Sequence, residues 1–417
     1  MNIYGLIILI ALLGNFVLAV IADWLNLRAL DPNLPGEFEG VYDTEKYASS
    51  QEYTRVGTRF GFVTTIFDLT LLLVFWQVGG FNYLDQLVRG WGLGVIATGL
   101  VFTGILLLTK TLISLPFSIY STFVIEERFG FNRTTPATFI TDLLKGIMLT
   151  IVLGGPLLAA VLWFFATAGN LAWLWCWGAV TLFTLIVQFI APAWIMPLFN
   201  KFSPLEEGEL REAIFNFADS VDFSLKNVFV MDGSKRSSKS NAFFTGFGRN
   251  KRIALFDTLI NNHSVPELVG VLAHEIGHYQ KKHILQGMVI SILHTGVMLY
   301  LLSIFVSHPG LFAAFHMEHS SIYAGMIFFG LLFTPIEMII SLLMNILSRH
   351  NEFEADAFAA EHTGEPKSMI EALKKLSVHN LANLTPHPFY VLLHYSHPPL
   401  LQRITALRAL AGGKQPN

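Results

Sequence analysis

Residues Pro266–Val306 read PELVGVLAHEIGHYQKKHILQGMVISILHTGVMLYLLSIFV, and this stretch decides what kind of fold the chain can have. Its first part, 266–280, has apolar residues at three- and four-residue spacing, which is typical of an amphipathic helix. Its second part, from Ile284 on, is an apolar run long enough to cross the roughly 30 Å hydrocarbon layer of a bilayer. The sequence therefore predicts a water-facing helix that leads directly into a membrane span.

The composition of the whole chain agrees with a membrane protein. Of 417 residues, 53% are hydrophobic and 14% are charged, against roughly 45–50% and 25% in soluble domains. The formal net charge is −3, so no basic surface indicates a nucleic-acid partner. The single cysteine, Cys176, cannot form an internal disulfide and is expected in the core or against lipid.

Seven apolar stretches are long enough to be membrane spans. They lie at about 3–22, 61–81, 92–116, 144–168, 171–197, 284–307 and 321–346. The first lacks a basic start and is too long for the apolar core of a cleaved signal peptide, so we expect it to be retained. The prediction is an all-α polytopic bundle with the lipid bilayer as a partner.

Basic residues between the spans predict the orientation, because short cytosolic loops carry an excess of Lys and Arg. The connections after odd-numbered spans hold Arg28, Lys46, Arg55, Arg59, Arg128, Arg133, Lys201 and Arg349. The connections after even-numbered spans hold only Arg89. We therefore expect the N-terminus outside and the C-terminus in the cytosol. With no evident retrieval signal in Lys414–Asn417, we expect the bacterial cytoplasmic membrane rather than the endoplasmic reticulum.

This map divides the chain into four regions. Residues 1–197 hold the first five spans, and 198–283 form a cytosolic insertion that carries the amphipathic helix. Residues 284–346 hold the sixth and seventh spans, and 347–417 form a second cytosolic segment.

Four ionisable residues fall inside the predicted spans: Asp68, Lys110, His294 and Glu337. Such groups are costly in hydrocarbon unless they meet water or a partner. Two interpretations are open. These residues line a wet interior, or they form buried ion pairs or lie near helix ends.

His274-Glu275-Ile276-Gly277-His278 is an HExxH motif on the amphipathic helix. His274 and His278 are four residues apart and share one helix face, so two neutral imidazoles can bind one Zn²⁺. Glu275 beside them can act as general base, taking a proton from water that zinc acidifies. This is the chemistry of amide hydrolysis, and the alternative is a surface helix with incidental histidines.

A catalytic zinc usually takes three protein ligands. The segment Asn351–Phe358 offers Glu352 and Asp356 at helical spacing, so both carboxylates face the same way. We expect Glu352 to be the third ligand and Asp356 to orient a histidine or donate a proton. Glu354 is expected to project elsewhere, although the chemistry alone leaves it open as a ligand. Since the sixth and seventh spans separate His278 from Glu352, the metal should lie at or slightly inside the cytosolic interface.

The HEIGH and NEFEAD motifs, together with the ending His394-Tyr395-Ser396-His397-Pro398-Pro399, resemble the type I CAAX prenyl endopeptidases. Two further stretches, Thr122–Asn132 and Ser240–Gly248, carry the same resemblance, which covers about residues 40–410. The resemblance implies a seven-span bundle enclosing a chamber, with a zinc metallopeptidase region that carries a small β edge.

The resemblance also implies roles for individual residues. His274, His278 and Glu352 would bind one zinc ion, with Glu275 as general base and Asp356 in a catalytic or supporting role. Asn241 would lie on an extended edge that pairs with the substrate backbone. His397 and Arg403 would stabilise the oxyanion and contact substrate. The remaining histidines at 283, 379, 387 and 394 are expected at surfaces or interfaces.

Three functions are considered on these grounds. The first is an endopeptidase that cleaves near the C-terminus of prenylated or otherwise hydrophobic substrates. The second is a quality-control metalloprotease for membrane proteins, whose members share HExxH and ExxxD but have fewer spans. The third is a transporter or channel with a structural zinc site, which would need a fourth protein ligand and no Glu275.

Overall fold

The computed structural model describes residues 2–245 and 252–412; residues 246–248 of the Ser240–Gly248 stretch, and Lys414–Asn417, lie outside them. Seven helices within the described residues are long and apolar enough to cross a membrane, which agrees with the predicted seven spans. They comprise α1 (Ile3–Arg28), α2 (Thr44–Gln77), α4 (Val95–Tyr120) with its π-helical end η2 (Ser121–Glu126), α5 (Pro136–Leu149) continuing through η3 (Thr150–Gly154) into α6 (Gly155–Thr167), α7 (Ala172–Ile190), α11 (His283–Phe305) and α13 (Ile322–Thr363).

Two spanning helices have polar extensions that an apolar window does not detect. α2 begins at Thr44 rather than near residue 61, and the Asp43 carboxylate caps it by accepting the Lys46 N–H at 2.6 Å. It ends at Gln77 rather than 81, because Gly79 adopts a left-handed φ of 74° and starts the separate helix α3 (Gly80–Arg89). α13 likewise continues past the predicted span end at 346 to Thr363.

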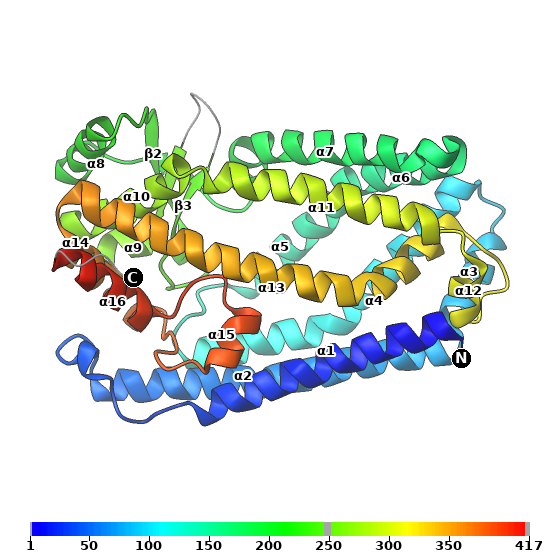
Figure 1. Ribbon diagram of the computed structural model, residues 1–417, viewed down its shortest axis with the longest axis horizontal. Helices are drawn as coiled ribbons and strands as arrows, with labels where there is room; N and C mark the ends of the chain where they lie inside the picture. Colours follow the sequence, from blue (N-terminus) through cyan, green and yellow to red (C-terminus); the bar gives the residue numbers. More distant parts are fainter. Residues whose placement is uncertain (1, 246–251, 413–417) are drawn as a thin grey trace.

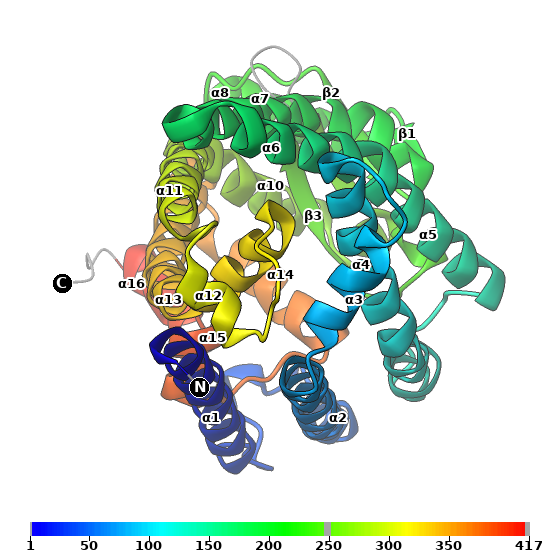
Figure 2. The same ribbon diagram turned by 90° about the vertical axis from the view of Figure 1, so that its right-hand side faces the viewer.

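The spanning helices form a ring one helix thick (Figure 2). Around it, α1 contacts α2 and α13, α13 contacts α11, α11 contacts α7, α7 contacts α6, and α6 contacts α4. The aromatic rings of Phe60 and Phe67 on α2 meet Phe117 of α4 and close the ring. At most 17% of each spanning window is buried, since each helix has an inner and an outer face that no other helix covers.

An aromatic cluster fills one end of the ring, beside α3 and the short helix α12 (Pro309–Ala314), which lie together in Figure 1. Trp76, Phe315 and Phe328 are fully buried there, and Phe315 stacks on both of the other rings. The Trp76 indole N–H donates to the Ala314 carbonyl at 2.7 Å, so its polar atom is satisfied within the apolar core.

The ionisable residues inside the spans form pairs. Lys110 of α4 bonds Asp68 of α2, and both side chains are about half exposed. His294 of α11 lies 3.1 Å from Glu337 of α13, whose side chain is 51% exposed. The structure therefore pairs these four residues, with side chains that are 25–51% exposed, and a wet interior around them stays a prediction. Cys176, in contrast, is fully buried in the helix core.

A water-facing region caps the other end of the ring. Its sheet has the order β1-β2-β4-β3, made of β1 (Phe202–Pro204), β2 (Asn227–Met231), β4 (Arg252–Phe256) and β3 (Ala242–Thr245). Around it lie α8 (Glu209–Ser220), α9 (Asp257–Asn262), α10 (Val265–Gln280), α14 (Pro366–His379) and α16 (Leu400–Ala411). The short helix α15 (Pro388–His394) contacts α1 and α13 instead. β3 is an edge strand, so the predicted small β edge is confirmed.

Candidate metal centre

α10 carries the HExxH motif and is fixed at its start by polar contacts. The Ser264 N–H donates to the Glu267 carboxylate at 3.0 Å, which caps the helix, and Glu267 also pairs with Lys375 of α14 at 2.8 Å. At its far end α10 lies against α13, where Gly277 faces the Ala355 backbone. This close approach brings the histidine face of α10 onto the acidic turn of α13.

Three predicted ligands converge between the two helices. The ring Nε2 atoms of His274 and His278 are 3.2 Å apart, and Glu352 oxygens lie 3.5 Å from the first and 3.2 Å from the second. Each of these three residues offers one donor atom within 4.8 Å of the others. His274 and Glu352 are buried, with 7% and 4% exposed, so a cation held here would be largely shielded from water.

One observation indicates that a metal fits this site. Glu352 Oε2 is buried, and among the described residues it has no hydrogen-bond partner. Its cationic neighbours, Arg403 Nη1 at 3.4 Å and His274 Nε2 at 3.5 Å, approach it without making a hydrogen bond. A buried carboxylate with one unsatisfied oxygen, whose two oxygens each approach an imidazole nitrogen, is part of the donor set expected for a zinc ion.

Asp356 lies one helical turn beyond Glu352 and holds His274 from behind. Its Oδ1 is 2.9 Å from His274 Nδ1, which leaves Nε2 free to face Glu352. Burial alone lowers the pKa of His274, but the adjacent carboxylates of Asp356 and Glu352 raise it to about 9. These carboxylates therefore favour a positive charge at the imidazole, whether a proton or a metal ion supplies it.

Arg403 of α16 is buried against the same carboxylates. Its Nε and Nη2 atoms donate to both oxygens of Asp356, at 2.8 and 2.6 Å, and its Nη1 faces Glu352. The pKa of Arg403 is raised: burial lowers it, but Asp356 and Glu352 outweigh that effect. In this arrangement Arg403 supports Asp356, and its predicted substrate contact stays a prediction.

His397 lies at the rim of the centre. Its Nε2 is 3.4 Å from Glu352 Oε1, its Nδ1 contacts the Ser396 hydroxyl at 3.0 Å, and its side chain is 65% exposed. The HYSHPP turn thus places one imidazole beside the three candidate ligands with most of its ring open to an incoming molecule.

Glu275 faces a cavity of about 370 Å³ next to the ligands. Phe243 and Phe244 of β3 line the same cavity, together with His278 of α10 and Met344 of α13. Burial raises the pKa of Glu275 above its ordinary value. A carboxylate with this environment binds a proton more readily than one in water, which suits a general base.

Asn241 begins the edge strand but lies outside the polar network around the three ligands. Its carbonyl accepts the Phe256 N–H at 3.1 Å, so Asn241 and Phe256 form a hydrogen-bonded pair of the antiparallel ladder. The backbone of Ala242 and Phe244 therefore points to the free edge. The Asn241 side chain accepts the Ala242 N–H at 2.9 Å and covers one of these edge groups.

The segment before β3 is tied to the membrane helices and to α14. Lys239 pairs with Glu126 of η2 at 2.9 Å. The Ser240 backbone N–H donates to the Asn380 side-chain oxygen at 3.1 Å, and the Asn380 side-chain NH2 donates to the Ser240 carbonyl at 3.2 Å. These contacts hold the edge strand in a fixed place relative to the ring.

His283 and Glu354 lie behind the candidate ligand His278. His283, expected at a surface or interface, is 8% exposed and lies 3.1 Å from His278 between ring Nδ1 atoms. Glu354 stays outside the three-ligand group, as expected, but contacts His283 at 2.9 Å. No sequence signal indicates the His278–His283 contact, because it depends on the left-handed backbone of Lys282 between the two helices.

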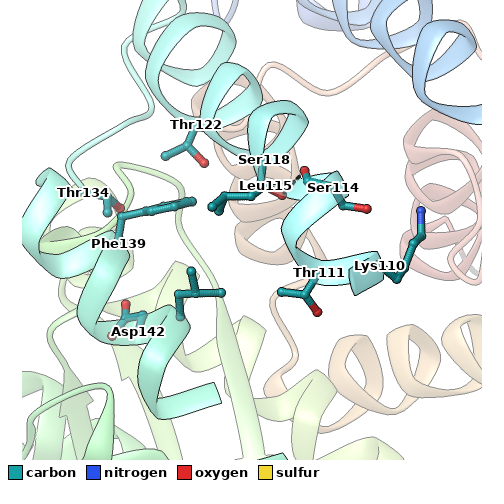
Figure 3. Close-up of a pocket in the computed structure, with 10 residues that line it drawn as sticks. Lys110, Thr111, Ser114, Leu115, Ser118, Thr122, Thr134, Phe139 and Asp142 are labelled. Carbon is teal, nitrogen blue, oxygen red and sulfur yellow. Dashed lines mark hydrogen bonds between the residues drawn. The ribbon is translucent and has the colours of Figure 1, made fainter. Parts of the chain in front are cut away.

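None of the predicted site residues lines a wider crevice between α4 and α5, shown in Figure 3. Its volume is about 520 Å³. Hydroxyl side chains of α4 and Asp142 of α5 border it, and Asp142 is bonded by Arg236 at 2.7 and 2.9 Å. This crevice, which Leu115, Phe139 and Leu143 also line, contains none of the three candidate ligands.

A ring of seven spans, an HExxH helix and a carboxylate delivered by the last span together define an integral-membrane metallopeptidase. Comparison with known proteins gives the family. Residues 3–201 match the N-terminal region of CAAX prenyl proteases, with five membrane helices, and residues 204–411 match peptidase family M48. The chain belongs to peptidase family M48 and is a multi-pass membrane metalloendopeptidase.

Its relatives cover nearly the whole chain. It is 38% identical to CAAX prenyl protease 1 of Saccharomyces cerevisiae over 90% of this chain and 89% of that protein. It is 34% identical to the human CAAX prenyl protease 1 homolog, covering 91% and 89%. The crystal structure of S. mikatae Ste24p superimposes with a TM-score of 0.92 at 35% identity, covering 98% of this chain and 99% of that one.

Proposed function

We propose that this chain is a zinc-dependent endopeptidase that cleaves peptide bonds near the C-terminus of prenylated CAAX proteins. The observation that carries the proposal is the convergence of His274, His278 and Glu352 beside a cavity bordered by Glu275 and the edge strand β3. The names of the relatives in yeast, rice and human supply the substrate class.

His274, His278 and Glu352 would hold the zinc, which supplies a Lewis acid for the scissile carbonyl and lowers the pKa of water. Glu275 would take a proton at its carboxylate from the water that attacks the scissile carbonyl carbon, and would return that proton to the leaving amine as the C–N bond breaks. Asp356 holds the proton on His274 Nδ1, and Arg403 holds Asp356. His397, at the rim of the centre, would donate to the oxyanion.

The free edge of β3 would bind the substrate backbone as an added strand. The Ala242 carbonyl and the Phe244 N–H and carbonyl point to that edge. Asn241 covers the Ala242 N–H with its side chain, so a substrate carbonyl would replace Asn241 there. The apolar rings of Phe243 and Phe244 border the same cavity and suit an aliphatic substrate segment.

The four-region division fits this mechanism: 1–197 and 284–346 build the ring, while 198–283 and 347–417 carry the catalytic groups. We propose that the catalytic end faces the cytosol, because the basic connections lie at that end. In Figure 1 the first turns of α1 and the helix α16 lie at opposite ends of the molecule, as an odd number of spans requires. Labelling single cysteines at Asn2 and Gly412 with an impermeant reagent tests the orientation. We also propose that the protein resides in a bacterial cytoplasmic membrane, and cell fractionation tests this location.

The function is tested with purified protein in detergent. Wild type and Glu275→Gln are compared on a farnesylated CAAX peptide, the same peptide without the farnesyl group, and casein, with zinc measured in each preparation. We expect cleavage of the farnesylated peptide by wild type alone, with equal zinc in both proteins. If zinc-loaded wild-type protein cleaves none of the three substrates, the proposed endopeptidase activity is contradicted. A preference for casein would support the quality-control alternative.

A further inference from the structure

His283, the first residue of α11, lies directly behind the candidate ligand His278. Their Nδ1 atoms are 3.1 Å apart, and the other ring nitrogen of His283 lies 2.9 Å from Glu354 Oε2. Only 8% of His283 is exposed, although it stands at the junction of a water-facing helix and a span. The contacts form one path from His278 through His283 to a carboxylate.

We propose that His283 and Glu354 are a positioning pair that fixes the ring orientation and tautomer of His278. The inference rests on the proposed function, because it takes His278 to be a zinc ligand. A metal-bound histidine typically donates its second ring N–H to a carboxylate, a carbonyl or water, and such partners affect metal affinity strongly.

The geometry fixes the direction of the hydrogen bonds. His278 Nε2 faces His274 and Glu352, each at 3.2 Å, so this nitrogen must be unprotonated to bind a metal. The proton of neutral His278 is then on Nδ1, where it donates to His283 Nδ1. His283 in turn carries its proton on Nε2 and donates it to Glu354. The opposite direction would turn a lone pair of His283 toward the carboxylate.

A break in the helix makes this contact possible. Residues five apart on a continuous α-helix point about 140° away from each other and cannot meet. α10 ends at Gln280, and Lys282 adopts a left-handed conformation with φ 62° and ψ 24°. α11 then begins at His283 with a new direction, which turns the imidazole back onto His278.

The two candidate histidine ligands are thus supported differently. Behind His274 the carboxylate of Asp356 is in direct contact, buried, and held by Arg403. Behind His278 the carboxylate is one imidazole further away, and Glu354 is 44% exposed. Glu354 lines a surface crevice of about 510 Å³ with Lys281 and Lys282, and exposed His350 is 3.6 Å from it.

The test compares four variants with wild type. His283→Phe keeps the ring volume without a nitrogen, and His283→Gln keeps one acceptor and one donor. Glu354→Leu removes the end of the path at a half-exposed position. The control is His350→Gln, which touches the same carboxylate from outside. Zinc affinity is measured by chelator competition, and the visible spectrum of Co²⁺-loaded protein reports ligand geometry.

We expect His283→Phe to weaken zinc binding by about 10–100-fold and to change the Co²⁺ spectrum. His283→Gln should recover most of the affinity, Glu354→Leu should lose several-fold, and His350→Gln should match wild type. If His283→Phe fails to fold, the Glu354→Leu result decides. If His283→Phe or Glu354→Leu keeps the zinc affinity and the Co²⁺ spectrum of wild type, the proposed positioning pair is wrong.

The outcome is separable from the proposed function. A wild type that neither binds zinc nor cleaves peptide contradicts the proposed function. A wild type that does both, with unchanged zinc affinity in the variants, contradicts the positioning pair alone.

Discussion

Arg403 and Asp356 form a two-bond ion pair in which the side chains are 10% and 2% exposed. Asp356 in turn contacts His274 Nδ1 at 2.9 Å, so the guanidinium supports a candidate zinc ligand through one carboxylate. The pair joins α13 to α16, which ties the last helix of the chain to the metal centre.

Removing one member of this pair should destabilise the protein. Asp356→Ala leaves a buried guanidinium without its partner, which typically costs about 3–5 kcal/mol. We expect a lower unfolding temperature in detergent and weaker zinc binding. Asp356→Leu combined with Arg403→Met removes both charges and should regain stability without regaining zinc affinity. Equal recovery of both properties would show that Asp356 does not position His274.

Gly277 should be intolerant of even one added methyl group. A Cβ there would lie 3.1 Å from the Ala355 carbonyl oxygen and 3.2 Å from its Cα, so the backbones of α10 and α13 would have to separate. Because these helices carry the ligands, we expect Gly277→Ala to weaken zinc binding at least tenfold. Gly330→Ala on α13, where a Cβ meets nothing within 4 Å, is the matched control. Similar zinc affinity in both variants would refute this account.

Asn380 should affect substrate use rather than metal binding. It holds the Ser240 backbone by two hydrogen bonds just before the edge strand. We expect Asn380→Ala to raise KM or lower kcat/KM about tenfold, because the strand proposed to pair with substrate loses its support. Zinc content should stay at the wild-type level. Loss of zinc in parallel with activity would argue against a separate role for the edge.

His379 should make stability depend on pH. Burial lowers its pKa, and the neighbouring His263, Lys46 and Lys375 lower it further. In the unfolded chain a histidine binds a proton near pH 6.5, while folded His379 resists it, so its stabilising contribution is present above about pH 6.5 and is lost as pH falls below that value.

His379→Gln should therefore reduce the loss of stability in acid. The measurement is the difference in unfolding temperature between variant and wild type at pH 7.5 and pH 5.5. We expect the variant to gain relative to wild type at the lower pH. A difference that is constant across this range would exclude His379 as the titrating group.

Much of the centre could be predicted because its geometry is local. His274 and His278, and likewise Glu352 and Asp356, are four residues apart on helices, and that spacing alone places each pair on one face. The convergence of the two pairs follows from the spans between them, which return the chain to the same side of the membrane.

His283 could not be predicted in this way, because its contact depends on a left-handed residue between two helices. Continuing α10 without interruption puts His283 on the wrong face. The start of α2 and the length of α13 were missed for a different reason. Their outer turns are polar, and a hydropathy window detects only the part of a helix that lies in hydrocarbon.

α13 is a single helix of 42 residues, which corresponds to a length of about 63 Å. Pro335 lies inside it, and from there to Thr363 the helix runs on without a break through Glu337, Glu352 and Asp356. The same unbroken segment therefore holds residues of the seventh span and two carboxylates of the metal centre. Anchoring this span in a bilayer also fixes the height of Glu352 and Asp356 relative to the membrane, with no separate connecting element between them.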